Sequence, residues 1–258
     1  MLRKHSTYRT NSDNIKLGLL TSFSSGMVNV VSVIAFFAFT SNVTGHYAIL
    51  AQEIAKGNWY QASVVLIWVA LFFFGSFTSN MLIIHLKKRK SQSWSHAVPL
   101  LLEIILLGFA GYYLQHFYSE TLQETELILG LMLFAMGLQN GLTASITNFS
   151  VKTTHLTGLT TDLGILFSMI TKKEYRTDKA ITDKIILLLS ILAGYMTGGI
   201  TAGLSFAYIE YNTLYLTCGV LVAVIVFDYS MFKLPRIAGR KQPYIRKVYV
   251  GEKAGTMQ

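Results

Sequence analysis

Two short polar motifs in corresponding parts of the chain carry groups that can bind a solute. Residues 41–46 read SNVTGH, and residues 154–159 read THLTGL. The glycine allows a backbone geometry that interrupts a helix, and asparagine or threonine can cap the helix that follows. Because a helix start offers free N–H donors and partial positive charge, each motif suits an anion or a carboxylate. A capped loop at the membrane surface is the alternative interpretation.

A second pair of motifs lies inside the apolar segments before these breaks. Gly-x-x-Asn occurs at 26–29 and at 137–140. Asn29 lies about 13 residues into its segment, or roughly 20 Å deep, and Gln139 and Asn140 are similarly deep. A buried amide without a partner costs a few kcal/mol, so these amides either bond between helices or line a solute cavity.

Several ionisable residues near the breaks are further candidates. Asp162 follows the second break by one helical turn, where the helix dipole also favours a structural carboxylate. His46 and His155 are not equivalent in the two motifs, and each is either a proton-coupling group or an interfacial histidine. The candidate substrate-binding residues are Asn29, Asn42, Thr44, Gln139, Asn140, Thr154, Thr157 and Asp162, and the proton-coupling candidates are His46 and His155.

Glu103 and Asp228 lie within apolar runs. An ionisable residue in a membrane span is a functional candidate. Both are expected near the cytoplasmic ends of their spans, shallow enough to reach the interface.

Signatures of soluble enzymes are missing from the chain. It has no phosphate-binding Gly-Lys-Ser/Thr loop, no His-Glu-x-x-His and no Gly-x-Ser-x-Gly. The one cysteine, Cys218, excludes an intrachain disulfide and a cysteine-based metal cluster. We therefore expect no enzyme, no catalytic residue, no metal site and no cofactor.

The elements that must position these residues are long apolar helices. The 258 residues are 52% hydrophobic and only 14% charged, whereas soluble domains have about 25% charged residues. Two short helices are expected at 47–56 and 159–170, with re-entrant and interfacial placements both open. Six segments have the roughly 20 residues needed to cross a membrane: 16–40, 60–85, 98–117, 127–149, 183–208 and 212–232.

The distribution of positive charge predicts the topology. The net charge is +9, and only Lys56 of the 22 Lys and Arg residues falls outside if both termini are cytoplasmic. Such an asymmetry follows the positive-inside rule. The basic surplus therefore indicates topology and attraction to anionic lipid, and it argues against a nucleic-acid partner.

The two halves predict an inverted repeat. Each has three spans, and an odd number turns the second half upside down relative to the first. The first break is then expected near the outer face and the second near the inner face. Gly75 and Ser79 are matched with Gly194 and Gly198, a spacing that lets helices approach closely. The expected organisation is a cytoplasmic tail (1–14), a three-helix repeat (15–117), an external acidic loop (118–126), a second repeat (127–232) and a basic cytoplasmic tail (233–258).

These motifs resemble the YoaK family, bacterial membrane proteins named for a domain of unknown function. The resemblance runs from about residue 18 to residue 233 and is most specific at 26–32, 42–45, 137–140 and 153–164. The family has Asp where this chain has Asn29, and usually Asn where it has His46. The resemblance implies a six-span protein of the bacterial plasma (inner) membrane and brings no established substrate.

We therefore predict an all-α, multi-pass membrane protein. The first hypothesis is a small secondary transporter or permease for a small polar or anionic solute, rocking about the repeat axis. The alternative is a non-transporting scaffold or binding protein whose polar motifs are structural. Membrane lipids are expected partners, and homo-oligomerisation is left open.

Overall fold

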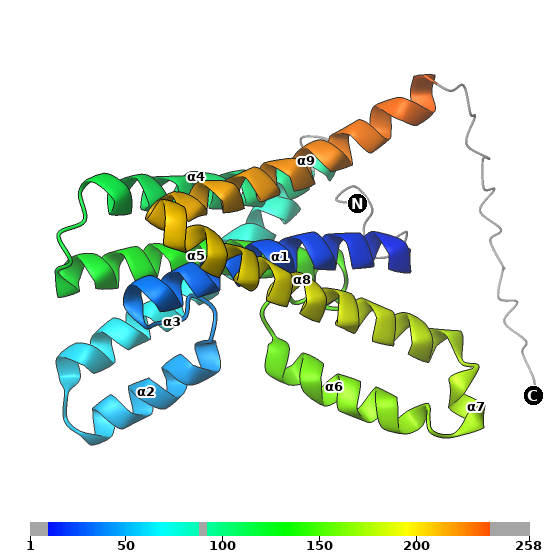
Figure 1. The fold of residues 1–258 in the computed structure, drawn as a ribbon, viewed down its shortest axis with the longest axis horizontal. Coiled ribbons are helices and arrows are strands. Elements are labelled where there is room, and N and C mark those ends of the chain that lie inside the picture. The colour runs from blue at the N-terminus through cyan, green and yellow to red at the C-terminus, as the bar shows by residue number, and fades with distance from the viewer. Residues whose placement is uncertain (1–9, 88–91, 238–258) are drawn as a thin grey trace, which may run out of the picture.

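The computed structural model describes residues 10–87 and 92–237, and every regular element in these two ranges is a helix (Figure 1). This confirms the predicted all-α fold class. In chain order the elements are α1 (Asn11–Phe36), α2 (Val43–Ala55), α3 (Trp59–Lys87), α4 (Gln92–His116), α5 (Leu122–Ile146), α6 (Leu156–Met169), α7 (Lys173–Arg176), α8 (Lys179–Ile209), the 3₁₀ turn η2 (Glu210–Asn212) and α9 (Thr213–Ile237).

Five stretches of the described chain are long and apolar enough to cross a membrane: Asn11–Phe36, Trp59–Leu86, Trp94–His116, Leu122–Ile146 and Lys179–Phe227. The last stretch contains α8, η2 and most of α9. Large apolar side chains such as Ile67 and Phe73 are more than half exposed. Extensive apolar exposure of this kind marks a surface that meets lipid or a partner. The helices are thus consistent with a multi-pass membrane protein.

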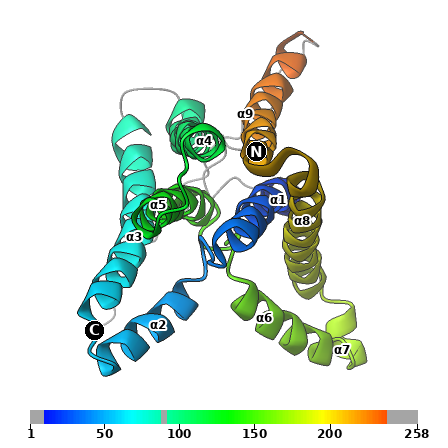
Figure 2. The same ribbon diagram turned by 60° about the vertical axis from the view of Figure 1, so that its left-hand side comes forward.

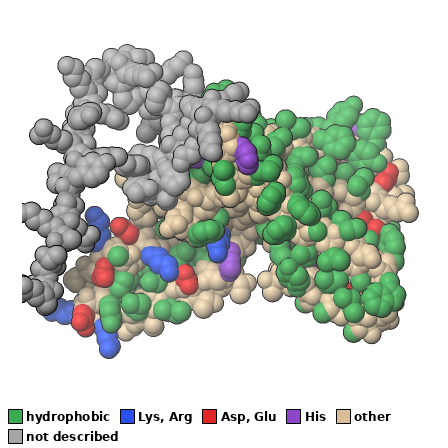
Figure 3. All heavy atoms as spheres, turned by 180° about the vertical axis from the view of Figure 1, so that it is seen from behind, with side chains coloured by type: hydrophobic (Ala, Val, Ile, Leu, Met, Phe, Trp, Pro, Cys, Tyr) green, Lys and Arg blue, Asp and Glu red, His purple; other side chains and the backbone are tan. Residues whose placement is uncertain are grey.

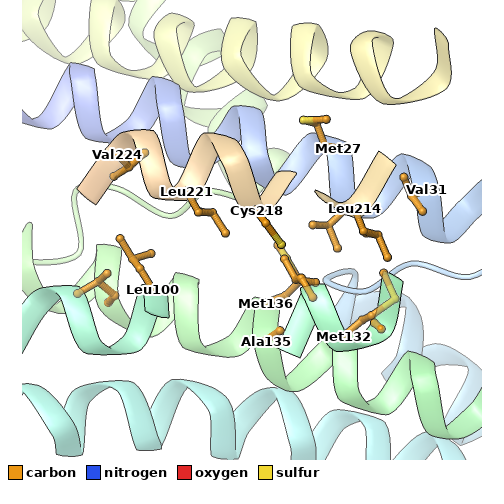
Figure 4. Packing of buried hydrophobic residues seen from close by; sticks show 14 of the residues in the cluster. Met27, Val31, Leu100, Met132, Ala135, Met136, Leu214, Cys218, Leu221 and Val224 are labelled. Atoms are coloured by element: carbon orange, nitrogen blue, oxygen red, sulfur yellow. The ribbon is translucent and has the colours of Figure 1, made fainter. Parts of the chain in front are cut away.

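The main core lies between α1, α4, α5 and α9. Figure 4 shows Leu100 and Met136 on two of these helices facing Cys218 and Leu221 of α9. All four side chains belong to one contiguous buried cluster. Helices distant in the sequence are therefore joined by one cluster of buried apolar side chains.

Glycines allow α1 to lie directly against α8. A Cβ atom on Gly26 would overlap the backbone carbonyl of Tyr195, and one on Gly198 would overlap that of Phe23. Small residues let helix backbones approach closely where lipid supplies no hydrophobic driving force.

The pairing of α3 with α5 repeats this arrangement. A Cβ atom on Gly137 would overlap the carbonyl of Phe72, and one on Gly75 would overlap that of Phe134. Gly75 thus has the environment of Gly198, facing a phenylalanine carbonyl. Gly194, which spacing had matched with Gly75, also meets a backbone carbonyl of α1, but that of Leu19, one turn before Phe23.

The two short helices lie on one side of this core. Helix α2 packs on α3, and α6 packs on α8. In Figures 1 and 2 their first turns face each other, and the helices then diverge toward opposite ends of the molecule. Figure 3 shows charged side chains gathered mainly at one end, over α6, α7 and the start of α8, with a hollow between that end and the part formed by α2 and α3.

Candidate functional site

A cavity of about 880 Å³ lies between the starts of α2 and α6. Asn42 and Thr44 line it from the first break, and Thr154, His155 and Thr157 line it from the second. The two breaks therefore border one cavity, and the expectation that they lie near opposite faces is wrong. Aromatic side chains form much of the wall: Phe39, Phe72, Phe73, Phe77, Phe149 and Tyr195.

The breaks meet because the chain folds back after each long helix. Phe37 has a φ of 56° after α1, and Asn148 and Phe149 have φ values of 51° and 61° after α5. Non-glycine residues rarely adopt this left-handed region. The backbone reverses at these positions, so each short helix starts beside the last third of the preceding long helix.

Asn29 holds the first fold-back in place. Its Nδ2 donates to Ser41 Oγ at 2.8 Å and to the Ser25 carbonyl at 3.0 Å. Its Oδ1 accepts from the backbone N–H of Thr40 at 3.2 Å. The side chain is 1% exposed and does not line the cavity. Both amide atoms are thus occupied by internal bonds.

Asn140 has the same role in the second half, with one difference. Its Nδ2 donates to the Met136 carbonyl at 2.9 Å, and its Oδ1 accepts from Thr153 and Thr154 hydroxyls, each at 3.2 Å. Asn140 is only half-buried and lines the cavity. The amide in the second half therefore lies close enough to the cavity for a solute to reach it.

The two helix starts differ in their capping. The Asn42 Oδ1 accepts from the Gly45 N–H at 3.2 Å. His155 is at the corresponding position of α6 but makes no side-chain cap. Its ring lies over Gly158, where a Cβ atom would overlap it. Because the first N–H groups of a helix have no partner within it, α6 presents donors that its N-cap side chain does not use.

The cavity has positive electrostatic character. Among the described residues that line it, Lys152 is the only Lys or Arg, and none is Asp or Glu. Each helix start adds the equivalent of roughly half a positive charge. The arrangement therefore favours an anion.

The wall opposite the breaks contributes polar groups that the sequence analysis did not select. Ser145 Oγ donates to Asn80 Oδ1 at 2.9 Å, and Ser76 Oγ donates to the Gly137 carbonyl at 3.0 Å. Asn80 and Ser145 both line the cavity. The sequence did contain a signal for Asn80, because it is an amide within an otherwise apolar segment. The same feature led to the selection of Asn29.

Asp162 lies outside this cavity. It borders a smaller pocket of about 260 Å³ together with Lys152 and His155. Its carboxylate pairs with Lys184 at 3.1 Å, which links α6 to α8.

Gln139 and His46 are buried away from the cavity. The Gln139 Oε1 accepts from Ser25 Oγ, and Gln139 is 0% exposed. His46 is 4% exposed, with Nε2 at 2.9 Å from the Phe39 carbonyl and its ring against Trp68. Neither side chain lines the cavity.

The comparisons with known proteins return one match. A family model described as a protein of unknown function, DUF1275, matches residues 17–227, which include both breaks, all of α2 to α8 and most of α1 and α9. No curated protein and no solved structure matches the chain.

Proposed function

We propose that this chain transports a small anionic solute, which binds between the starts of α2 and α6. The chain belongs to the DUF1275 family of proteins of unknown function. The observation that carries the proposal is the convergence of two helix N-termini on one cavity. In many secondary transporters, discontinuous helices point their N-termini at anionic groups near the bilayer midplane.

The chemistry of the lining supports an anion more than a neutral polar solute. Lys152 supplies a full positive charge, and the N–H groups at the start of α6 are oriented donors. Hydroxyl and amide groups of Thr44, Thr157 and Asn140 offer further hydrogen bonds. The aromatic walls leave room for a small organic acid as well as an inorganic anion.

The proposed membrane arrangement has six spans in two inverted three-helix repeats. Helices α8 and α9 count as separate spans, because α8 has 31 residues, α9 has 25, and Glu210 between them has a φ of 47°. The equivalent close contacts of Gly26 with α8 and of Gly137 with α3 support the repeat. Helices α2 and α6 are then re-entrant, and movement of one repeat against the other exposes the cavity to each side in turn.

The proposed location is the bacterial inner membrane, with both termini in the cytoplasm, as in the YoaK proteins that the motifs resemble. The charged end formed by α6, α7 and the start of α8 supports this orientation (Figure 3), since basic segments stay on the cytoplasmic side.

Uptake into proteoliposomes tests the proposal. The probes are chloride, sulfate, phosphate, formate and succinate, each with an opposing ion gradient. We expect at least one of them to enter with saturation kinetics. Lys152→Gln should then raise its half-saturation concentration about tenfold, equivalent to about 1.4 kcal/mol of lost binding.

Lys56→Gln is the matched control, because Lys56 lies at the far end of α2 and pairs with Glu53 at 2.8 Å. It should leave the half-saturation concentration unchanged. If none of the five anions enters and none raises the unfolding temperature, the transporter proposal fails. The scaffold alternative then stands, favoured by the wholly internal hydrogen bonds of Asn29.

A further inference from the structure

Glu103 lies deep inside the helix bundle. Helix α4 begins at Gln92 and continues through Pro99, so Glu103 is near the middle of its 25 residues. Its side chain is 0% exposed. The expectation that it reaches the interface is wrong, because the predicted span started at residue 98 and omitted the first turns of the helix.

The Glu103 carboxyl has no hydrogen-bond partner on either oxygen. Leu100 and Leu107, one turn before and after it, belong to the apolar core between α1, α4, α5 and α9. An isolated carboxylate in such surroundings is far more costly than a neutral carboxylic acid. In this conformation the side chain therefore carries a proton.

Few ionisable groups face Glu103 from the neighbouring helices. Helix α9 contributes Cys218, whose Sγ donates to the Ile104 carbonyl on α4 at 3.5 Å. On α4 itself, His96 is fully buried two turns earlier. The turn η2 carries Glu210 and Tyr211 and packs against the other end of α4.

The remaining two neighbours of α4 contribute no charge in the core. Helix α5 has no ionisable residue after Glu126, and α3 has none between Tyr60 and His85. Helix α5 does contribute Gln139, whose Nε2 is buried and unpartnered.

We propose that Glu103 is a proton-binding site in the membrane interior, loaded in this conformation and unloaded when α4 separates from α9. On separation, the acidic proton passes to water entering the opened interface, and the carboxylate left behind takes hydrogen bonds from that water. Gln139 precedes Asn140, which lines the cavity, so the core around Glu103 and the solute site share helix α5. A role for Glu103 in coupling proton and anion movement rests on the proposed function. Its role as a proton-binding site does not depend on that function.

Infrared spectroscopy of the full chain in liposomes tests the proton directly. At pH 7 we expect a C=O stretching band of a protonated carboxyl group in the parent protein. The band should be absent from Glu103→Gln and shifted in Glu103→Asp. Glu124→Gln is the control and should retain it, because Glu124 accepts bonds from Tyr113 and Ser119 at the helix end. A band that is missing from the parent, or that both Glu103 variants retain unchanged, would show that Glu103 is not the protonated group and would overturn the proposal.

Cys218 reports the separation of α4 from α9, since it is the only cysteine and is 8% exposed. We compare its labelling rate with a membrane-permeant maleimide in the parent and in Glu103→Gln, each at pH 6 and pH 9. The two proteins should label at equal rates at pH 6. At pH 9 the parent should label about tenfold faster, which corresponds to one pKa unit of coupling between Glu103 ionisation and helix separation. Comparing the two proteins at one pH cancels the pH dependence of thiolate formation that they share.

Equal labelling at both pH values would contradict unloading by helix separation. If the carboxyl band is present but no anion enters proteoliposomes, the proposed function fails while the proton site stands. If anions enter and the band is absent, the proton site fails alone.

Discussion

The Asn29 side chain donates a hydrogen bond to Ser41 Oγ at 2.8 Å. The last turns of α1 and the chain reversal that follows them separate the two residues in the sequence. This bond brings the first break back beside the last third of α1. Asn140 accepts from Thr154 at the corresponding place in the other half. Two internal amides thus determine that both short helices start beside the same cavity.

Removing the Asn29 amide should destabilise the protein strongly. Asn29→Ala deletes bonds to Ser25, Ser41 and the Thr40 N–H, and it leaves buried polar groups without partners. We expect a loss of about 2–4 kcal/mol, since each orphaned buried group costs about 1–3 kcal/mol. Chemical unfolding in detergent measures the loss. Asn80→Ala, at an exposed position on the cavity wall, serves as the control and should cost less than about 1 kcal/mol. Equal losses would contradict the structural role of Asn29.

The glycine contacts should tolerate no side chain. Gly198→Ala and Gly75→Ala each place a methyl group on a backbone carbonyl of the facing helix, so the helices must move apart. We expect each to lower the free energy of unfolding by roughly 3 kcal/mol, at the upper end of ordinary overpacking costs. The two effects should be similar, because the two sites have the same environment.

Gly164→Ala is the matched control for this series. Nothing lies within 4 Å of its added Cβ atom, and alanine is the better helix former by about 1 kcal/mol. The change should therefore be neutral or stabilising. A Gly198 variant as stable as the Gly164 variant would show that α1 and α8 are not in this close contact.

The ion pair between Asp162 and Lys184 should contribute little to stability. Its side chains are 45% and 52% exposed, and exposed pairs contribute about 0–1 kcal/mol. A double-mutant cycle with Asp162→Asn and Lys184→Gln should give a coupling energy below about 1 kcal/mol, decreasing as salt is added. A larger, salt-independent coupling would indicate that the pair is shielded from water in the protein as it folds in the membrane.

The two ends of the molecule should label from different sides. In a Cys218→Ser background, Glu124→Cys should react with an impermeant maleimide in intact cells. Lys173→Cys, on α7, should react only after the membrane is permeabilised. The reason is the retention of basic segments in the cytoplasm. The reverse pattern would invert the proposed orientation, and labelling of both from outside would contradict the proposed span count.

The sequence by itself determined the helices and most of the polar residues from which the candidate site is built. Apolar length predicted the long helices, and the polar motifs predicted a short helix after each. Helices α2 and α6 start four and three residues before the predicted 47 and 159, so Gly45 and Gly158 lie in their first turns. These features are local, since hydrophobic runs and helix caps depend on residues a few positions apart. Two inverted repeats of three spans remain a prediction, supported by the paired glycine contacts.

Only the tertiary structure decided which of these residues meet. Asn29 and Asn140 appear equivalent in the sequence, yet one is wholly buried and the other borders the cavity. The depth of Glu103 depended on a helix that continues through Pro99. Above all, the breaks share one cavity because the chain reverses at Phe37 and again after α5. Those reversals are stabilised by hydrogen bonds to amides more than ten residues earlier, and such long-range partners leave no periodic trace in the sequence.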